Sequence, residues 1–292
     1  MVTVIRAKDV NRDKKFEPPY SIEFGICNDT VHDPKMVLGH TVSPPGARIQ
    51  RHYHVNCDVG QYRIRGYDRM IVGPDHEKQA IDVGPGDFVF IPRGIIHGGL
   101  NLSDTEPGEV IFCYIGVGSI EESKTIKIEP PPKAGQKIDD PVKIQASMKG
   151  EKGTVTVIRS KDLKSDKKYE PPYGIKFGIC DDTVDHPKMV MGHTAIPPGS
   201  RVQRHYHVNC DVGQYRIKGH TRMIVGPEHE RQEIDVGPGE FVFIPRGEIH
   251  GGMNLSEAEP GEVVFCYIGV GSTKEAKTIK IEPPWEYKFP NP

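Results

Sequence analysis

The feature that most constrains this chain is an internal repeat that covers nearly its whole length. Residues 2–131 align with residues 155–284 without a gap, and about three-quarters of the aligned residues are identical. Such a repeat is too long for a solenoid or a propeller blade, and it has the usual size of a globular domain. We therefore predict two copies of one domain, at residues 1–131 and 154–292, joined by a linker at 132–153.

Charge and hydropathy exclude several classes of protein. The chain has 38 Lys and Arg against 40 Asp and Glu, a formal net charge of −2, so nothing favours nucleic acid or an anionic membrane as a partner. No apolar run approaches the ~20 residues of a membrane span, and the N-terminus lacks the apolar segment of a signal peptide. We expect a cytoplasmic protein whose six cysteines, at matched positions in the two halves, are free thiols.

Glycine and proline divide each half into short segments. The chain contains 32 Gly and 26 Pro, and the runs between them are rich in Val, Ile, Phe and Tyr. Examples are residues 61–64, 70–72, 88–91 and 110–115. Short strands separated by turn residues, without a sustained helical period, predict an all-β sandwich or barrel for each half.

Three histidines in each half have the spacing of metal ligands. His52 and His54 point to the same face of a predicted strand, because residues i and i+2 share a face. His97 follows another predicted strand, which a barrel can bring beside the first pair. The same pattern recurs in the second half as His205, His207 and His250. We therefore predict one divalent metal ion in each half, since neutral imidazole is a common ligand of Fe, Zn, Cu and Ni.

Two motifs around these histidines resemble those of the cupin family. Residues 46–54 read GARIQRHYH and resemble the start of the first cupin motif, and residues 86–101 read GDFVFIPRGIIHGGLN and match the second motif at every fixed position. Both motifs recur at residues 199–207 and 239–254. The resemblance implies a bicupin, with two tandem jelly-roll β-barrels and a histidine-bound metal ion inside each.

The first motif departs from the family pattern at its glutamate. Cupins usually carry a glutamate shortly after the second histidine, and here that position is Val59, with Val212 in the second half. Three ligand sets remain open: the three histidines alone, the histidines with Gln61, or the histidines with Asp58.

Polar residues share the predicted inner face with the histidines. Gln61 and Arg63 alternate with outward-facing residues and recur as Gln214 and Arg216. Because a buried arginine requires an anionic partner, we hypothesise that Arg63 and Arg216 bind a carboxylate or enolate of a small substrate. The alternative is a twist that turns Arg63 outward into a surface salt bridge. The predicted catalytic residues are therefore Gln61, Arg63, Gln214 and Arg216.

The resemblance to three-histidine cupins implies a mononuclear non-haem Fe(II) dioxygenase. Its substrates would be O2 and a small, anionic organic acid, a diketone or a phenolic compound, and both histidine sets are intact, so two working sites are expected. The alternatives are a non-redox lyase, isomerase or hydrolase with Zn, Ni, Mn or Cu, and a cupin that binds a small ligand without turnover. The sequence leaves the substrate and any homo-oligomer open.

Overall fold

The structure is a computed structural model that describes residues 1–10, 12–128 and 154–283. Within these ranges nearly all regular structure is β, with two four-residue helices, α1 (Ile120–Ser123) and α2 (Thr273–Ala276). The predicted linker at 132–153 and the tail with Trp285 lie outside the described residues. The predicted fold class, two tandem jelly-roll barrels, is confirmed.

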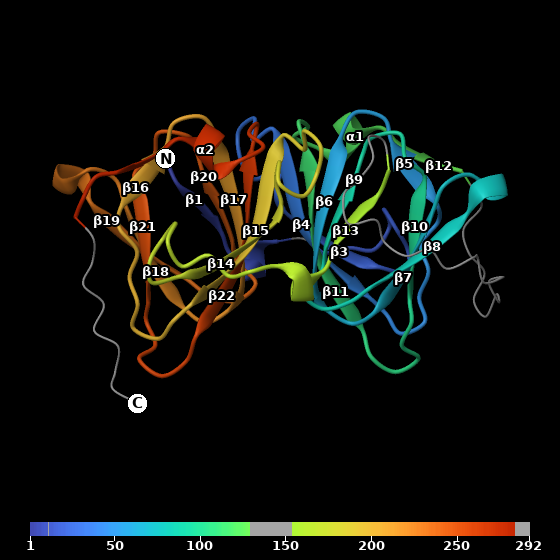
Figure 1. The fold of residues 1–292 in the computed structure, drawn as a ribbon, viewed down its shortest axis with the longest axis horizontal. Coiled ribbons are helices and arrows are strands. Elements are labelled where there is room, and N and C mark those ends of the chain that lie inside the picture. The colour runs from blue at the N-terminus through green and yellow to red at the C-terminus, as the bar shows by residue number, and fades with distance from the viewer. Residues whose placement is uncertain (11, 129–153, 284–292) are drawn as a thin grey trace. The chain divides into compact units, whose positions relative to one another are not determined.

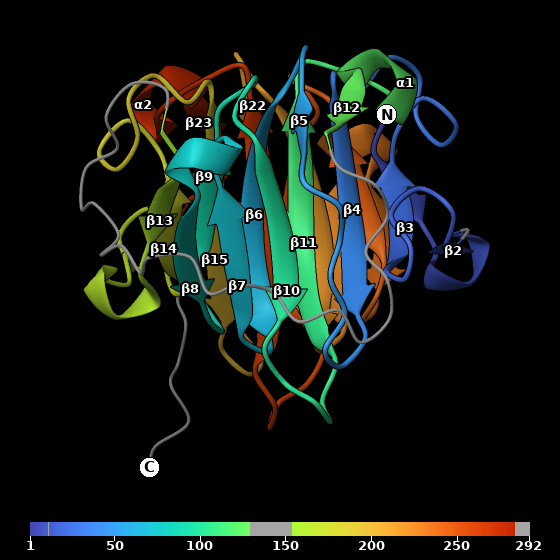
Figure 2. The same ribbon diagram turned by 90° about the vertical axis from the view of Figure 1, so that its right-hand side faces the viewer.

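The N-terminal barrel comprises Val10–Asp162 and Asp181–Pro187 and consists of two antiparallel sheets. Figure 2 shows five strands of the larger sheet, β9, β6, β11, β4 and β3, side by side. In order across this sheet the strands are β13 (Thr156–Ile158), β9 (Phe88–Ile91), β6 (Asp58–Arg65), β11 (Gly108–Ile115), β4 (Met36–Ser43), β3 (Ser21–Ile26) and β2 (Arg12–Asp13). The smaller sheet contains β12 (Thr125–Lys127), β5 (His52–His54), β10 (His97–Asn101), β7 (Asp68–Val72) and β8 (Gln79–Val83).

The C-terminal barrel comprises Met1–Asp9, Leu163–Cys180 and Lys188–Pro292 and repeats this arrangement (Figure 1). Its larger sheet contains β1 (Thr3–Ile5), β20 (Phe241–Ile244), β17 (Asp211–Lys218), β22 (Gly261–Ile268), β15 (Met189–Ile196) and β14 (Gly174–Ile179). Its smaller sheet contains β19 (Gln232–Val236), β18 (Thr221–Val225), β21 (His250–Asn254), β16 (His205–His207) and β23 (Thr278–Lys280). Short 3-10 turns lie at Ala7–Asp9, Asp75–Glu77, Ser160–Asp162 and Glu228–Glu230.

Each barrel takes one edge strand from the other half of the sequence. Strand β1 pairs with β20, with Val4 opposite Val242, and β13 pairs with β9, with Val157 opposite Val89. The compact units therefore differ from the predicted boundaries of 1–131 and 154–292 at their first strands. The repeat explains why the sequence could not decide this pairing. Strands β1 and β13 both read TVI, and β9 and β20 both read FVFI. Pairing within one half or between the halves therefore buries the same side chains.

Apolar side chains from both sheets fill the interior of each barrel. In the N-terminal barrel the core includes Val59, Met70, Ile91 and Phe112, and the C-terminal barrel buries their counterparts. Glycine φ values near +80° at the turn glycines Gly86 and Gly239 fit the left-handed conformation that other residues adopt only with strain. The short strands and tight turns thus leave the barrel interior as the place where buried polar groups gather.

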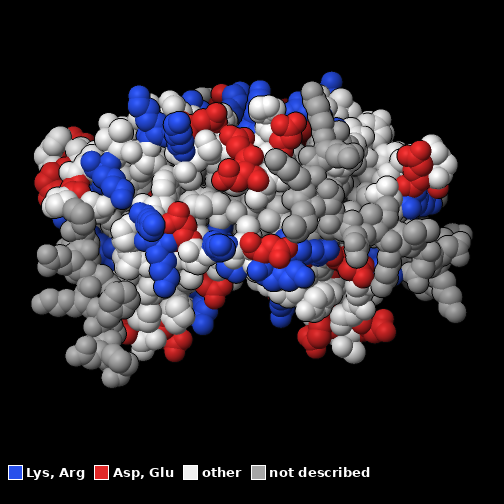
Figure 3. All heavy atoms as spheres, in the orientation of Figure 1, with Lys and Arg blue, Asp and Glu red and all other residues white. Residues whose placement is uncertain are grey.

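Charged side chains of both signs cover the surface. On the face drawn in Figure 3, Lys and Arg are interspersed with Asp and Glu, in keeping with the near-neutral formal charge. None of the helices in the described ranges combines the length and the hydropathy that a membrane crossing requires.

Candidate metal centre

The three predicted histidines of each half meet inside its barrel. Strand β5 lies between β12 and β10, and His97, the first residue of β10, is the register partner of His52. The ligand nitrogens of His52, His54 and His97 lie within 4.8 Å of one another, and all three side chains are buried. The C-terminal barrel forms the same cluster from His205, His207 and His250.

Hydrogen bonds at the Nδ1 atoms orient the imidazoles. His52 Nδ1 donates to the Gln50 carbonyl at 2.9 Å, and His97 Nδ1 donates to the Ile95 carbonyl at 2.8 Å. His54 Nδ1 lies 2.9 Å from Thr125 Oγ1. The two carbonyl acceptors place the proton of His52 and His97 on Nδ1 and leave their Nε2 lone pairs for a metal ion. The second cluster has equivalent bonds, from His205 to Gln203, from His250 to Glu248 and from His207 to Thr278.

Burial keeps the histidines in their metal-binding protonation state. Loss of solvation lowers the pKa of His52 to about 4, of His97 to about 3 and of His54 to about 2, and nearby imidazoles add to the shift for His54 and His97. A neutral imidazole is the form that coordinates a metal ion. The sites are therefore ready to bind a cation throughout the physiological pH range.

A glutamate that the sequence analysis did not consider lies beside each cluster. Glu17 Oε1 lies 3.3 Å from His52 Nε2, and Glu170 Oε1 lies 3.3 Å from His205 Nε2. Burial raises the pKa of Glu17 to about 7 and also raises that of Glu170. In its ionised form this carboxylate faces an unprotonated Nε2, so two acceptors lie together and a cation between them would satisfy both. The donor set of three imidazoles and one carboxylate therefore fits a divalent metal ion.

Of the two fourth ligands considered from sequence, Asp58 is engaged away from the cluster and Gln61 lines its cavity. Asp58 accepts hydrogen bonds from Arg93, at 2.8 Å from the backbone nitrogen and 3.1 Å from Nε, so it is engaged away from the cluster. Gln61 lines the same cavity as the histidines, but Glu17 is the carboxylate beside them. The signal that could have located it is the sequence Glu-Pro-Pro-Tyr, which recurs at residues 17–20 and 170–173.

In each barrel a second hydroxyl group contacts the threonine that hydrogen-bonds the second histidine of the HxH motif. The residue that supplies this hydroxyl differs between the halves. In the N-terminal barrel Ser123 Oγ lies 3.0 Å from Thr125 Oγ1 and donates to the Ile120 carbonyl at 2.6 Å. In the C-terminal barrel the equivalent serine is an alanine, and the Tyr169 hydroxyl lies 2.7 Å from Thr278 Oγ1 instead. Both arrangements leave the threonine oxygen able to accept the histidine Nδ1 proton.

We expect Thr125→Val to weaken metal binding in the N-terminal barrel by about 10- to 100-fold, the usual effect of removing a hydrogen bond that orients a ligand. Competition with a fluorescent chelator measures the affinity of each of the two sites. Thr105→Ala is the matched control, because Thr105 is exposed and the second half has alanine there. An unchanged affinity in Thr125→Val would show that the hydrogen bond does not orient His54.

A small cavity opens beside each cluster. The cavities measure about 70 Å³ in the N-terminal barrel and about 60 Å³ in the C-terminal barrel. A water molecule needs about 10–15 Å³ of such space, so each cavity holds roughly four to seven waters or one small organic molecule. Their walls are largely apolar, and the polar lining residues include the predicted Gln61, Arg63, Gln214 and Arg216.

The predicted arginines face inward, not outward. Arg63 is buried and its Nη1 lies 2.6 Å from Asp68 Oδ2, which also lines the cavity. Arg216 is buried at the equivalent position in the other barrel. The alternative of a surface salt bridge is therefore wrong, and Asp68 already supplies the anionic partner that was expected to be a substrate in the N-terminal barrel.

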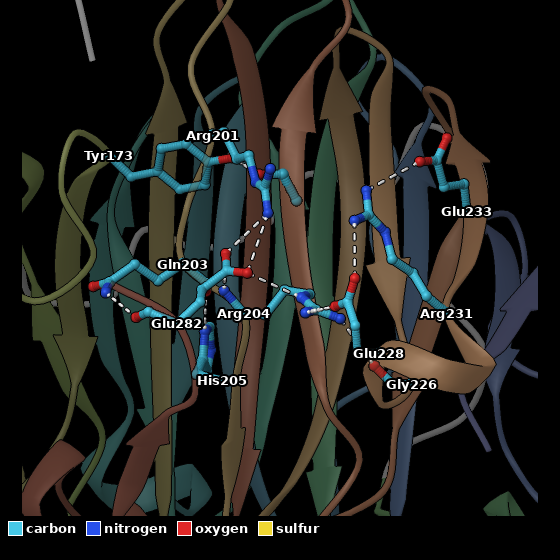
Figure 4. Close-up of polar contacts among 11 residues, drawn as sticks. Tyr173, Arg201, Gln203, Arg204, His205, Gly226, Glu228, Arg231, Glu233 and Glu282 are labelled. Atoms are coloured by element: carbon cyan, nitrogen blue, oxygen red, sulfur yellow. Dashed lines mark hydrogen bonds and ion pairs between the residues drawn. The ribbon is translucent and has the colours of Figure 1, made fainter. Parts of the chain in front are cut away.

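Hydrogen bonds and ion pairs connect the segment after β23 to the residues just before His205 (Figure 4). The Glu282 carboxylate accepts hydrogen bonds from Arg201 at 3.0 Å and from the backbone nitrogen of Arg204 at 2.9 Å. The Gln203 side chain donates to the Glu282 carbonyl at 2.7 Å, while the Gln203 carbonyl accepts from His205 Nδ1. The network thus holds the backbone group that orients one metal ligand.

All six cysteines are free and buried, as expected. Cys57, which follows the HxH motif closely, is fully buried, and loss of solvation raises its pKa to about 12. A thiol of that pKa stays protonated at neutral pH, which argues against a role as a thiolate ligand.

Comparison with known sequences agrees with this geometry. The family model described as "Cupin domain" matches residues 39–114 and 192–267, which together span half of the chain and include all six clustered histidines. The chain belongs to the cupin family. Two matches in register make it a bicupin, as the motifs predicted.

Other cupins share the fold or part of the sequence. Bacillus subtilis oxalate decarboxylase at pH 4.6 superposes with a TM-score of 0.72 and 15% identity, over 96% of this chain and 78% of that one. A second structure of that enzyme, studied for its Mn(II) centres, gives a TM-score of 0.72 and 14% identity over 96% and 79%. The tetracenomycin polyketide synthase protein TcmJ of Streptomyces glaucescens is 32% identical over 102 residues, 35% of this chain and 62% of TcmJ.

Proposed function

We propose that this bicupin is a metal-dependent enzyme that acts on a small organic acid. Its two centres would each hold one divalent ion, through His52, His54, His97 and Glu17 in one barrel and His205, His207, His250 and Glu170 in the other. The observation that carries the proposal is the carboxylate beside three oriented imidazoles at the wall of a small, largely apolar cavity.

The size of the cavities favours a small acid over a larger compound. Room for about four to seven waters suits a molecule of a few carbon atoms, whereas a polyketide of the kind suggested by the TcmJ name would exceed it. Gln61 and Gln214 can each hydrogen-bond a substrate oxygen, and their apolar neighbours exclude bulk water.

We propose Fe(II)-dependent dioxygenation as the leading reaction. A bound iron ion supplies the one-electron chemistry that O2 requires, and manganese or zinc would supply Lewis acidity. Histidine together with carboxylate is the donor combination of many non-haem iron oxygenases. The protein groups then bind the acid, hold it in one orientation and keep water away from it.

A redox-neutral cleavage of the acid is the second candidate. It is favoured by the mixed histidine and glutamate donor set, because carboxylate ligands suit manganese, and the oxalate decarboxylase with a similar fold has been studied for its Mn(II) centres. The two candidates share the same residues and differ in metal and in their need for O2.

Metal analysis combined with gas measurements tests both reactions. The purified protein is analysed for metals and then supplied with a panel of small carboxylic acids, diketones and phenolic compounds, while O2 uptake and CO2 release are recorded. Iron with substrate-dependent O2 uptake is the expected result. Manganese with CO2 release and no net O2 uptake would favour the second candidate, and a metal-free protein without turnover would refute both.

A further inference from the structure

The polar lining of the two cavities differs beside an arginine that both share. Asp68, the first residue of β7, corresponds to Thr221, and Ser43, the last residue of β4, corresponds to Ile196. These positions adjoin each other, since a Cβ built on Gly108 would lie 2.6 Å from Ser43 Oγ and 3.3 Å from Asp68 Oδ1. The N-terminal barrel thus has a serine and an aspartate where the C-terminal barrel has an isoleucine and a threonine. These two neighbouring differences make the electrostatics of the two cavities unequal.

In the N-terminal barrel the arginine is neutralised by the protein itself. Arg63 and Asp68 are both buried and form an ion pair of 2.6 Å. The pair has no net charge, so the cavity that it lines has no excess cation near this wall. A carboxylate entering there would meet Asp68 as well as Arg63 and would be repelled by the former.

In the C-terminal barrel the same guanidinium has no anionic partner among the residues that the structure describes. Arg216 is 3% exposed, and its Nε and Nη1 make no hydrogen bond with any described residue. Thr221 replaces the aspartate, and its Oγ1 is also without a partner. Burial lowers the pKa of Arg216 to about 10, which still leaves the group charged at neutral pH. A buried, unpaired cation is costly, and a bound anion compensates it.

We propose that Thr221 makes the C-terminal cavity a carboxylate site and that Asp68 makes the N-terminal cavity a site for an uncharged ligand. The carboxylate would accept hydrogen bonds from Arg216, whose planar guanidinium matches the two carboxylate oxygens, and from Thr221 Oγ1. This inference rests on the proposed function only in taking the two cavities as ligand sites. It assigns the small acid to one of the two centres and identifies position 68/221 as the determinant of ligand charge.

Exchanging the two side chains between the barrels tests the assignment. Acetate is titrated calorimetrically into the full chain, whose metal content is measured in parallel. The wild-type chain is expected to bind one acetate, Thr221→Asp to lose at least about 30-fold in affinity, and Asp68→Thr to bind two acetates. Each variant introduces only a residue that the other barrel already holds at that position, and Arg216→Gln provides an independent loss of binding.

The outcomes separate this inference from the proposed function. Two acetates bound by the wild-type chain, none bound, or an affinity unaffected by both Thr221→Asp and Arg216→Gln would overturn the inference, even if the protein turns over a small acid. The expected shifts in stoichiometry would support it even if no turnover is found. If either Thr221→Asp or Asp68→Thr fails to fold, as judged by its melting transition, the other variant and Arg216→Gln still test the inference.

Discussion

Replacement of His54 by alanine is expected to lower the metal content from two ions per chain to one. The substitution removes one of three clustered imidazoles, and the remaining donors of the N-terminal barrel would then hold a divalent ion much more weakly. His207→Ala is expected to empty the other site in the same way, and the double variant to bind no metal. Elemental analysis after dialysis against a weak chelator measures all three.

The histidines at 76 and 229 provide the matched controls. They occupy equivalent positions in the two halves, and their side chains are 78% and 77% exposed. Alanine at either position should leave both ions bound. Retention of two ions by the His54→Ala, His207→Ala double variant would disprove the candidate metal centres.

Glu17→Gln is expected to weaken metal binding in the N-terminal barrel by about 100-fold or more. The amide keeps the size of the side chain but removes the negative charge that a cation beside His52 would neutralise. The expected loss exceeds the 10- to 100-fold typical of residues that only orient a ligand. Titration with Mn2+ or Zn2+, followed by calorimetry, gives the affinity of each site, and Glu170→Gln should act on the other barrel alone.

Asp58→Asn is the control that distinguishes Glu17 from Asp58 as the fourth metal ligand. Asp58 is held by Arg93, so its replacement should leave metal affinity nearly unchanged. A large loss of affinity in Asp58→Asn together with little change in Glu17→Gln would assign the fourth ligand to the residue considered from sequence instead.

Local patterns in the sequence identified the fold and the histidines. Strand alternation places His52 and His54 on one face, and the cupin motif around His97 places it beside them, which the structure confirms. These features depend on residues close in sequence or on a motif of fixed spacing. The inward orientation of Arg63 followed from the same alternation, whereas its partner Asp68 did not.

Long-range contacts decided what the sequence left open. Glu17 lies 35 residues before His52, between β2 and β3, and only the tertiary fold brings its carboxylate to that histidine. No periodicity links such a residue to the HxH motif. Glu17 was not among the fourth ligands considered from sequence because those were taken from one strand, at residues 58–61.

The sequence by itself determined two all-β cupin domains with three histidines each, because strand period, turn residues and motif spacing are local properties. Only the tertiary structure decided which strand closes which barrel, which carboxylate joins the histidines and which arginine lacks a counter-ion. These depend on which distant segments pack together, and in a chain of two nearly identical halves a given segment has two equivalent partners.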